Sequence, residues 1–363
     1  MTSEAKPQSR KNLGKLVASV LKGAWRRYPP SINLSAEELE TVAPLLLGSG
    51  AGALGWWRVR QTDLNQTPAA LQLQEAYRLH SLQSALHEAQ IKEIISLFRS
   101  AGLTPVLVKG WSVARLYPEM GLRPYGDIDL CFRPEEYSKA EEALKRSTGK
   151  KYDIDLHEGF TKLDGLSLED LLARSKTLTL GEVEVQVLGL EDQLRILCTH
   201  LLRHSAWRPL WLCDIAVAVE SLPPDFDWDR FISDDPLQAD WIACAIGLAH
   251  QLLGAEVDDT PVATRAKNLP SWLVPHVLKN WNRPFPDYYP PLSYSRPLAT
   301  YLRDPRGLVN TLIMRWPDPI EATIRLRGPF NESPRLPYQL GNLISRVGKF
   351  LIALPRSLKR SDR

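Results

Sequence analysis

The stretch VLVKGWSVARLYPEMGLRPYGDIDLCF, residues 106–132, decides the expected fold. Two short runs rich in Val, Leu and Ile, one ending at Lys109 and the other beginning at Asp127, flank a segment that fits a short helix and a loop. Short apolar runs separated in this way predict two strands of one sheet. The second run carries two acids, Asp127 and Asp129, with one apolar residue between them.

Side chains alternate along a strand, so Asp127 and Asp129 are expected on the same face, about 7 Å apart. Two carboxylates so placed repel each other, and their pKa values rise unless a cation lies between them. Hard oxygen ligands of this kind suit Mg²⁺. We therefore expect a divalent metal site that a third carboxylate from a neighbouring strand completes.

Two acids are candidates for this third carboxylate. Asp155 lies between Ile and Leu in YDIDLHEGF (152–160), and Glu184 lies in the alternating run EVEVQVLGL (182–190). We prefer Asp155, because it follows the paired aspartates by one helix and one strand and can neighbour them in a small mixed sheet. His157 shares the strand face of Asp155, where it either reaches the site or forms a structural hydrogen bond.

Helices are expected on both sides of these strands. Ser35 and Glu38 have the spacing of a capping box at the start of one helix, and a longer helix is expected over about 69–100. After Gly189 three apolar helices follow, and from Pro261 onward 15 of the 28 prolines interrupt regular structure. The sequence predicts an α+β fold, in which helices back a small mixed sheet, with N-terminal helices and a C-terminal helical extension.

The 363 residues are enough for a sizeable core and an extension. A net charge of +3 is too small to imply nucleic-acid binding by itself. Four cysteines without CxxC spacing predict reduced core thiols, and no apolar run is long enough to span a membrane, so a cytoplasmic protein is expected. The expected segments are an N-terminal helical segment 1–68, a core with the sheet 69–190, a helical bundle 191–260, and a Pro-rich irregular region with a basic tail 261–363.

The order of KG, a short helix, LYP, RPYGDIDL and a further apolar-Asp-apolar strand resembles the nucleotidyltransferase superfamily typified by DNA polymerase beta. It is most similar to an uncharacterised bacterial branch of that superfamily. The resemblance covers roughly residues 75–220. The residues that carry it are Lys109, Gly110, 116–118, Arg123, Pro124, 127–130 and 155–157.

The resemblance implies a nucleoside triphosphate donor such as ATP, with Mg²⁺ or Mn²⁺, and transfer of a nucleoside monophosphate to an unknown hydroxyl acceptor with loss of pyrophosphate. It implies that Asp127 and Asp129 hold two metal ions and that Asp155 binds the metal that activates the acceptor hydroxyl. The acceptor is a small molecule, a saccharide or a peptide, and nucleic acid is not expected.

The turn after the first strand departs from the Gly-Ser or Gly-Gly that is usual in the superfamily. This chain has Gly110 followed by Trp111, with Ser112 one place later. Lys109, Gly110, Ser112 and Arg123 are the residues expected to contact the nucleotide phosphates. The alternative, which Trp111 motivates, is a catalytically inactive member that uses the same scaffold as a binding or assembly module.

A second group of potential metal ligands lies downstream. His200 and His204 are four residues apart on one face of an expected helix, and Asp214 follows as a possible third ligand for a hydrolytic metal site. The glutamate of an HExxH motif is missing and the helix is strongly apolar. Packed or hydrogen-bonded histidines are therefore the expected outcome.

Overall fold

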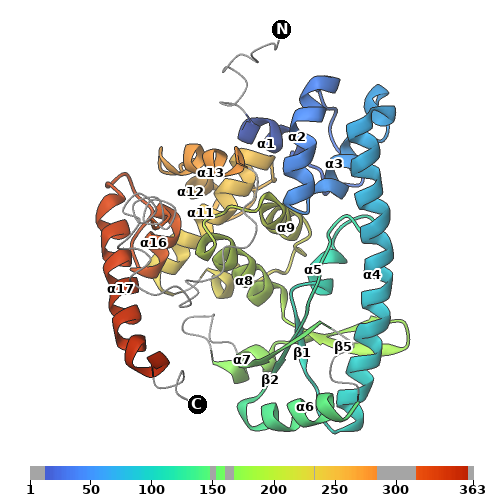
Figure 1. Ribbon diagram of the computed structural model, residues 1–363, viewed down its shortest axis with the longest axis vertical. Helices are drawn as coiled ribbons and strands as arrows, with labels where there is room; N and C mark the ends of the chain where they lie inside the picture. The colour runs from blue at the N-terminus through green and yellow to red at the C-terminus, as the bar shows by residue number, and fades with distance from the viewer. Residues whose placement is uncertain (1–12, 148–152, 160–166, 233, 284–315, 359–363) are drawn as a thin grey trace.

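One five-stranded mixed sheet lies in the lower half of this α+β protein in the view of Figure 1. Strand β1 is its middle strand, and the order is β3-β2-β1-β5-β4. This confirms the fold class expected from the sequence. The strands are β1 Val106–Val108, β2 Ile128–Phe132, β3 Ile154–Glu158, β4 Lys176–Leu180 and β5 Val183–Val187. The computed structural model describes residues 13–147, 153–159, 167–232, 234–283 and 316–358.

The sheet mixes parallel and antiparallel pairs. Strand β1 runs antiparallel to β2 and parallel to β5, while β3 is parallel to β2 and β4 is antiparallel to β5. Strand β4 was not expected from the sequence; it has the sequence KTLTL, and Lys176, Thr177 and Thr179 are exposed. Gly181, with a φ of +62°, lies in the two-residue turn that joins β4 to β5.

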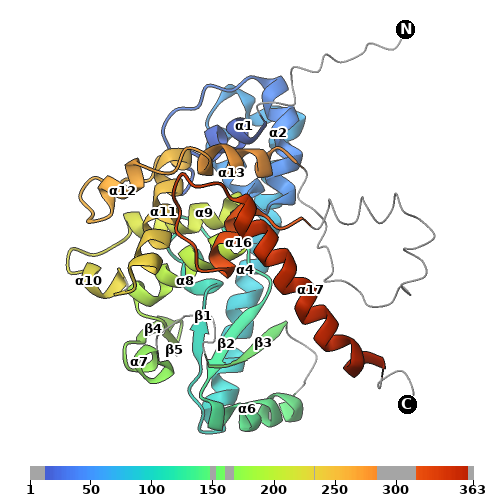
Figure 2. The ribbon, with the colours of Figure 1, turned by 90° about the vertical axis from the view of Figure 1, so that its left-hand side faces the viewer.

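Helices cover both faces of the sheet, and each face takes alternate residues of β2. Ile128, Leu130 and Phe132 pack against α4 (Pro68–Ser100) and α6 (Pro134–Ser147). Cys131 lies on the opposite face with residues of α7 (Leu168–Ala173) and α8 (Leu190–Arg203). In Figure 2 the strands lie between α6 at the lower end and α8 above. Asp129 belongs to the face that α8 covers, because it is two residues from Cys131.

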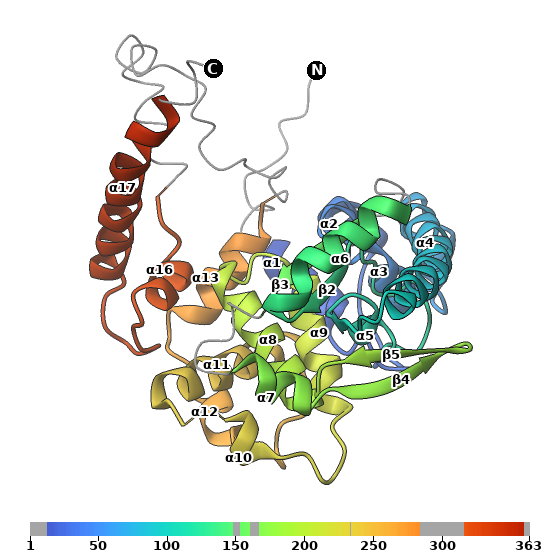
Figure 3. The ribbon, with the colours of Figure 1, turned by 90° about the horizontal axis from the view of Figure 1, so that it is seen from below.

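Helix α4 is the longest helix of the described chain, with 33 residues, and it runs along one side of the molecule (Figures 1 and 3). Thr67 caps it by accepting a hydrogen bond from the Ala70 amide, and Pro68 occupies its first turn. Gly102, with a φ of +67°, follows its end. The helix expected over 69–100 is therefore confirmed.

The N-terminal helices share one hydrophobic core with the helices that follow the sheet. Ser35 and Glu38 form the expected capping box at the start of α2. The expected segment boundaries near residues 68, 190 and 260 stay predictions. The helices of this core include α1 Leu13–Leu21, α2 Ala36–Gly48, α3 Gly52–Val59, α9 Pro209–Glu220, α11 Pro236–Leu253 and α13 Leu273–Trp281.

The region after Pro261 contains helices where irregular structure was expected. Helix α16 (Pro319–Arg325) packs on α8, and α17 (Leu336–Leu358) lies on the opposite side of the molecule from α4 (Figures 1 and 3). The six prolines of 284–315 and the end of the basic tail lie outside the described residues. The shorter elements are η2 Asp63–Gln66, α5 Trp111–Ala114, α10 Trp228–Phe231 and α12 Ala263–Lys267.

A buried ion pair ties the loop before β2 to helix α9. Arg123 Nη2 lies 2.9 Å from Asp214 Oδ2, and the Tyr117 hydroxyl donates to Asp214 Oδ1 at 2.8 Å. The Asp214 side chain is fully buried and the Arg123 side chain is 9% exposed. These contacts fix the loop from which Asp127 enters the sheet.

Replacing one member of this pair should strongly destabilise the protein. Asp214→Ala leaves the Arg123 charge buried without its carboxylate, so the free energy of unfolding should fall by about 3 to 5 kcal/mol in urea denaturation. Arg146→Ala is the matched control, because it breaks an exposed pair with Glu142 and should cost less than about 1 kcal/mol. Equal losses for the two variants would contradict the structural role of the buried pair.

Candidate functional site

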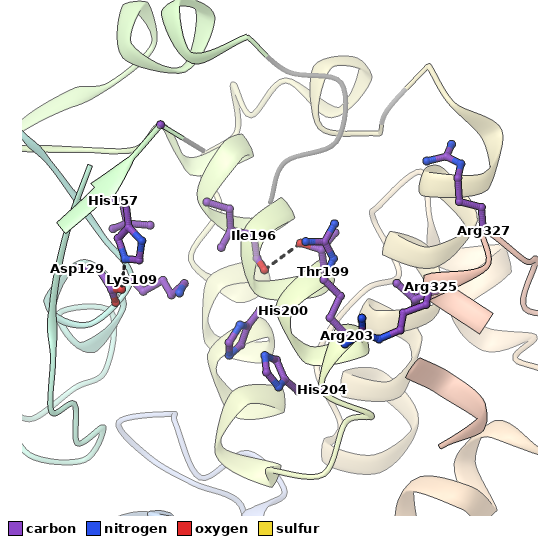
Figure 4. A pocket seen from close by; sticks show the side chains of 13 residues that line it. Lys109, Asp129, His157, Ile196, Thr199, His200, Arg203, His204, Arg325 and Arg327 are labelled. Atoms are coloured by element: carbon purple, nitrogen blue, oxygen red, sulfur yellow. Dashed lines mark hydrogen bonds and ion pairs between the residues drawn. The ribbon is translucent and has the colours of Figure 1, made fainter. Parts of the chain in front are cut away.

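Asp129 and Asp155 are directly opposed on the neighbouring parallel strands β2 and β3. Residues in register on such strands point to the same face, so the two carboxylates lie side by side. Asp129 is buried in the sheet, with a side chain 8% exposed, whereas the Asp155 side chain is 59% exposed on the edge strand. The Nε2 of His157 is 2.7 Å from Asp129 Oδ1, as Figure 4 shows, and it is 3.4 Å from Asp155 Oδ2.

These three side chains form a group that could hold a metal ion. Among the described residues, ligand atoms of Asp129, Asp155 and His157 all lie within 4.8 Å of one another. Two carboxylates supply the hard oxygen ligands that Mg²⁺ and Mn²⁺ prefer. The imidazole either adds a nitrogen ligand or orients Asp129 by its hydrogen bond. The residues present therefore fit a divalent cation.

Glu184, the other candidate for the third carboxylate, lies elsewhere. It belongs to β5, which β1 separates from β2. Its Oε2 pairs with Arg99 Nη2 at 3.3 Å at the surface beside α4. The strand order thus places Asp155, and not Glu184, next to Asp129.

Two cavities meet at Asp129, and the side chains of Lys109, Asp129 and His200 line both. We call the first the turn cavity; it has a volume of about 460 Å³ and contains the turn after β1. We call the second the arginine cavity; it has a volume of about 520 Å³ and extends toward α16 (Figure 4). The turn cavity is also lined by Gly110, Arg123, Tyr125, Asp127, Arg208 and Trp211. The arginine cavity is also lined by His157, Arg203, His204, Arg325 and Arg327.

Asp127 lies just before β2 and is exposed. It lines the turn cavity together with Asp129, so the two acids of the DIDL stretch open onto one space. Asp127 is outside the group formed by Asp129, Asp155 and His157. Asp129 is therefore the carboxylate common to two pairs: it shares the turn cavity with Asp127 and lies beside Asp155 in the sheet.

The turn after β1 has an unusual backbone. Lys109 has a φ of +60° and Gly110 a φ of +46°, a region that favours glycine. The Ser112 hydroxyl donates to the Lys109 carbonyl at 2.8 Å, and Ser112 is 1% exposed. Ser112 thus stabilises the turn from behind, while Lys109 and Gly110 line the cavity.

Trp111 points away from both cavities. Its indole donates to Glu88 Oε1 on α4 at 2.9 Å, and its side chain packs in the core between α4 and the sheet. Arg123 lines the turn cavity, but its Nε and Nη2 donate to Asp214, and its Nη1 donates to the Pro124 carbonyl at 3.5 Å. Its main contacts are therefore structural.

Residues 49–254 match a protein family described as an uncharacterised nucleotidyltransferase. The chain belongs to this family. The matched range includes α4, the whole sheet, the metal-ligand group and helices α8, α9 and α11. No curated protein and no solved structure gives a match. Among the described helices, none combines the length and the apolar character needed to cross a membrane.

Several residues of this candidate site carried no signal in the sequence. Arg208 lines the turn cavity, its Nε donates to the Ser49 carbonyl at 2.7 Å, and burial lowers its pKa. Arg203, Arg325 and Arg327 come together only through the packing of α16 on α8. Isolated arginines have no spacing pattern, so the sequence could not single them out.

The group of His200, His204 and Asp214 does not form. The two imidazole rings are 4.5 Å apart and both contact Trp211, whereas Asp214 pairs with Arg123. The expectation of packed histidines is therefore met. All four cysteines are buried and free, and burial raises the pKa of the Cys131 thiol to about 12.

His87 of the turn cavity should stay neutral at neutral pH. Burial lowers its pKa below the ordinary value of 6.5, and the charges of Asp153 and Asp127 offset part of this effect. The folded state thus favours the neutral ring, so its contribution to stability is present above pH 6.5 and is lost as pH falls toward the lowered pKa. Proton NMR titration in a chelating buffer should give a midpoint below 6.5.

The His87→Gln variant assigns the resonance, because it removes that signal and leaves the other histidines. Asp127→Asn should lower the His87 midpoint further, since it removes a negative charge that favours the imidazolium. A midpoint at or above 6.5 would show that the ring is not desolvated as described.

Proposed function

We propose that the protein is a divalent-metal-dependent nucleotidyltransferase that moves a nucleoside monophosphate from a nucleoside triphosphate to a hydroxyl acceptor. The observation that carries this proposal is the register of Asp129 and Asp155 on adjacent strands, with Asp127 opening onto the same cavity as Asp129. Family membership supports it independently. The acceptor oxygen forms a bond to the α-phosphorus, the bond to the β-phosphate oxygen breaks, and pyrophosphate leaves.

Each carboxylate has a distinct part in this proposal. Asp127 and Asp129 would hold one metal ion, and Asp129 and Asp155 would hold a second one. When bound, Mg²⁺ or Mn²⁺ ions stabilise the attacking and leaving oxygens of the displacement. His157 orients Asp129 through their 2.7 Å contact.

The turn cavity suits the triphosphate of the donor. Lys109 supplies a positive charge that faces Asp129, and Gly110 allows a phosphate to approach the backbone closely. Arg208 adds a second cation on the same side. Arg123 supports the loop and adds charge behind it, and Ser112 keeps the turn in shape.

The alternative to an enzyme is a catalytically inactive binding or assembly module. This alternative is based on the presence of Trp111 in the turn after β1. The indole of Trp111 packs into the core and donates to Glu88, so it does not occupy the space where a phosphate would lie. Within the described site, no other feature favours the inactive alternative.

Nucleotide binding and turnover should depend on the paired carboxylates. With Mg²⁺ or Mn²⁺, at least one of ATP, GTP, CTP and UTP should raise the thermal midpoint of the wild type. Asp129→Asn and Asp155→Asn should abolish this shift, and each should lower pyrophosphate release by on the order of 10²- to 10³-fold. Glu184→Gln is the matched control, since Glu184 lies on β5 away from the site. If Glu184→Gln has the larger effect, the assignment of the third carboxylate is wrong.

Replacing His157 should separate positioning from metal ligation. His157→Ala removes the contact with Asp129 and should weaken Mn²⁺ binding by about 10- to 100-fold in an electron paramagnetic resonance titration. His157→Gln places an amide near the position of Nε2 and should recover most of the affinity if the ring only orients Asp129. Unchanged Mn²⁺ affinity in His157→Ala would remove His157 from the site.

A further inference from the structure

The arginine cavity is strongly cationic. Lys109, Arg203, Arg325 and Arg327 line it together with histidines, and Asp129 is the acid among the described lining residues (Figure 4). Its volume of about 520 Å³ is that of a small-molecule site. Such a surface favours an anionic ligand.

Two of the arginines form ion pairs with carboxylates, and these pairs occupy only part of the N–H donors of each guanidinium. Arg325 Nε lies 2.6 Å from Glu321 Oε1, and Arg327 Nη2 pairs with Asp235. A guanidinium has five N–H groups, so each arginine keeps donors for a second anion. Glu321 also pairs with Arg346 at 2.7 Å, so two arginines share its charge.

The segment that carries these arginines is firmly packed. Ile320, Thr323 and Ile324 of α16 are buried. Beyond the helix, the Trp241 indole donates to the Gly328 carbonyl at 2.8 Å, and the Phe330 amide donates to Asp240 Oδ2 at 3.1 Å. Packing of α16 on α8 brings Arg325 close to Arg203, as Figure 4 shows.

The cavity also has a defined place relative to the carboxylates. The turn cavity, proposed for the donor, and the arginine cavity share Asp129 and Lys109, and His157 lines the arginine cavity. An in-line displacement requires the acceptor to enter opposite the leaving pyrophosphate. With the triphosphate in the turn cavity, the arginine cavity is the second space that opens at Asp129, next to the pair of Asp129 and Asp155.

We propose that the acceptor is an anionic hydroxyl compound, and that Arg203, Arg325 and Arg327 bind its phosphate or carboxylate group. This inference rests on the proposed function and specifies the substrate class of the same site. Arg325 and Arg327 lie beyond residue 254, where the family match ends. Recognition of the anion therefore combines Arg203, which lies within the matched range, with two arginines that lie outside it.

The test uses the full chain with Mg²⁺ and a non-hydrolysable α,β-methylene triphosphate of the nucleotide that binds best. With this analogue saturating, calorimetry compares glycerol 3-phosphate, glycerate and glycerol, which share hydroxyl groups and differ in charge. Glycerol 3-phosphate or glycerate should bind and glycerol should not, and the stronger of the two identifies the anionic group. If none of the three binds at 20 mM, or glycerol binds as well as the anions, the inference is overturned.

Variants then locate the binding site. Arg325→Gln and Arg327→Gln should each weaken binding of the anionic probe about tenfold or more, because each removes a charge-assisted contact. Both side chains are 55% exposed, so the thermal midpoint should be nearly unchanged. Arg346→Gln is the matched control, since Arg346 contacts the same Glu321 but does not line the cavity. Equal effects of Arg346→Gln and Arg325→Gln would overturn the inference.

The same experiment distinguishes two kinds of failure. Absence of analogue binding to the wild type contradicts the proposed function itself. Normal analogue binding, together with probe affinities that Arg325→Gln and Arg327→Gln leave unchanged, contradicts the anionic acceptor alone. In the expected case these two variants retain the affinity for the analogue.

Discussion

The site depends on one constraint: two carboxylates are held side by side on neighbouring parallel strands, and one of them is buried. Burying the charge of Asp129 is costly unless other charges or hydrogen bonds compensate. The fold supplies His157 within hydrogen-bonding distance and places Lys109 at the same cavities. Because Ile128 and Leu130 face the opposite core, β2 cannot rotate to expose Asp129. The sheet therefore keeps the carboxylates of Asp129 and Asp155 close enough to repel each other, and a bound cation would offset this repulsion.

Alternation within a strand could be predicted from the sequence, and the opposite placement of Ile128 and Asp129 in β2 agrees with it. Asp127 was expected on the same strand, but it lies just before β2 and shares a cavity with Asp129. The choice of Asp155 over Glu184 followed from the order of elements, and the β3-β2-β1-β5 arrangement agrees with it. Strand β4 escaped prediction because its polar residues resemble a surface loop. The orientation of the Trp111 side chain could not be predicted either, since no sequence pattern indicates that its indole donates to Glu88 on α4.

Cations were harder to assign than acids. Arg123 precedes the DIDL stretch and could have faced a phosphate, but the fold brings Asp214 within 2.9 Å of it from a helix far along the chain. Arg208 and the three arginines of the second cavity are united by the packing of α8, α9 and α16, which leaves no local pattern. Cationic side chains that reach a site only through tertiary packing therefore cannot be predicted from local sequence patterns.

Helix α16 brings to the cavity residues that are far along the chain from the strands that carry the carboxylates. The carboxylates come from two strands in the middle of the chain, whereas part of the wall facing them comes from residues near 325. Changes in that late segment can alter the wall without shifting β2 or β3. Under the proposed function, relatives with the same sheet and a different segment at this position would modify different compounds by the same transfer step.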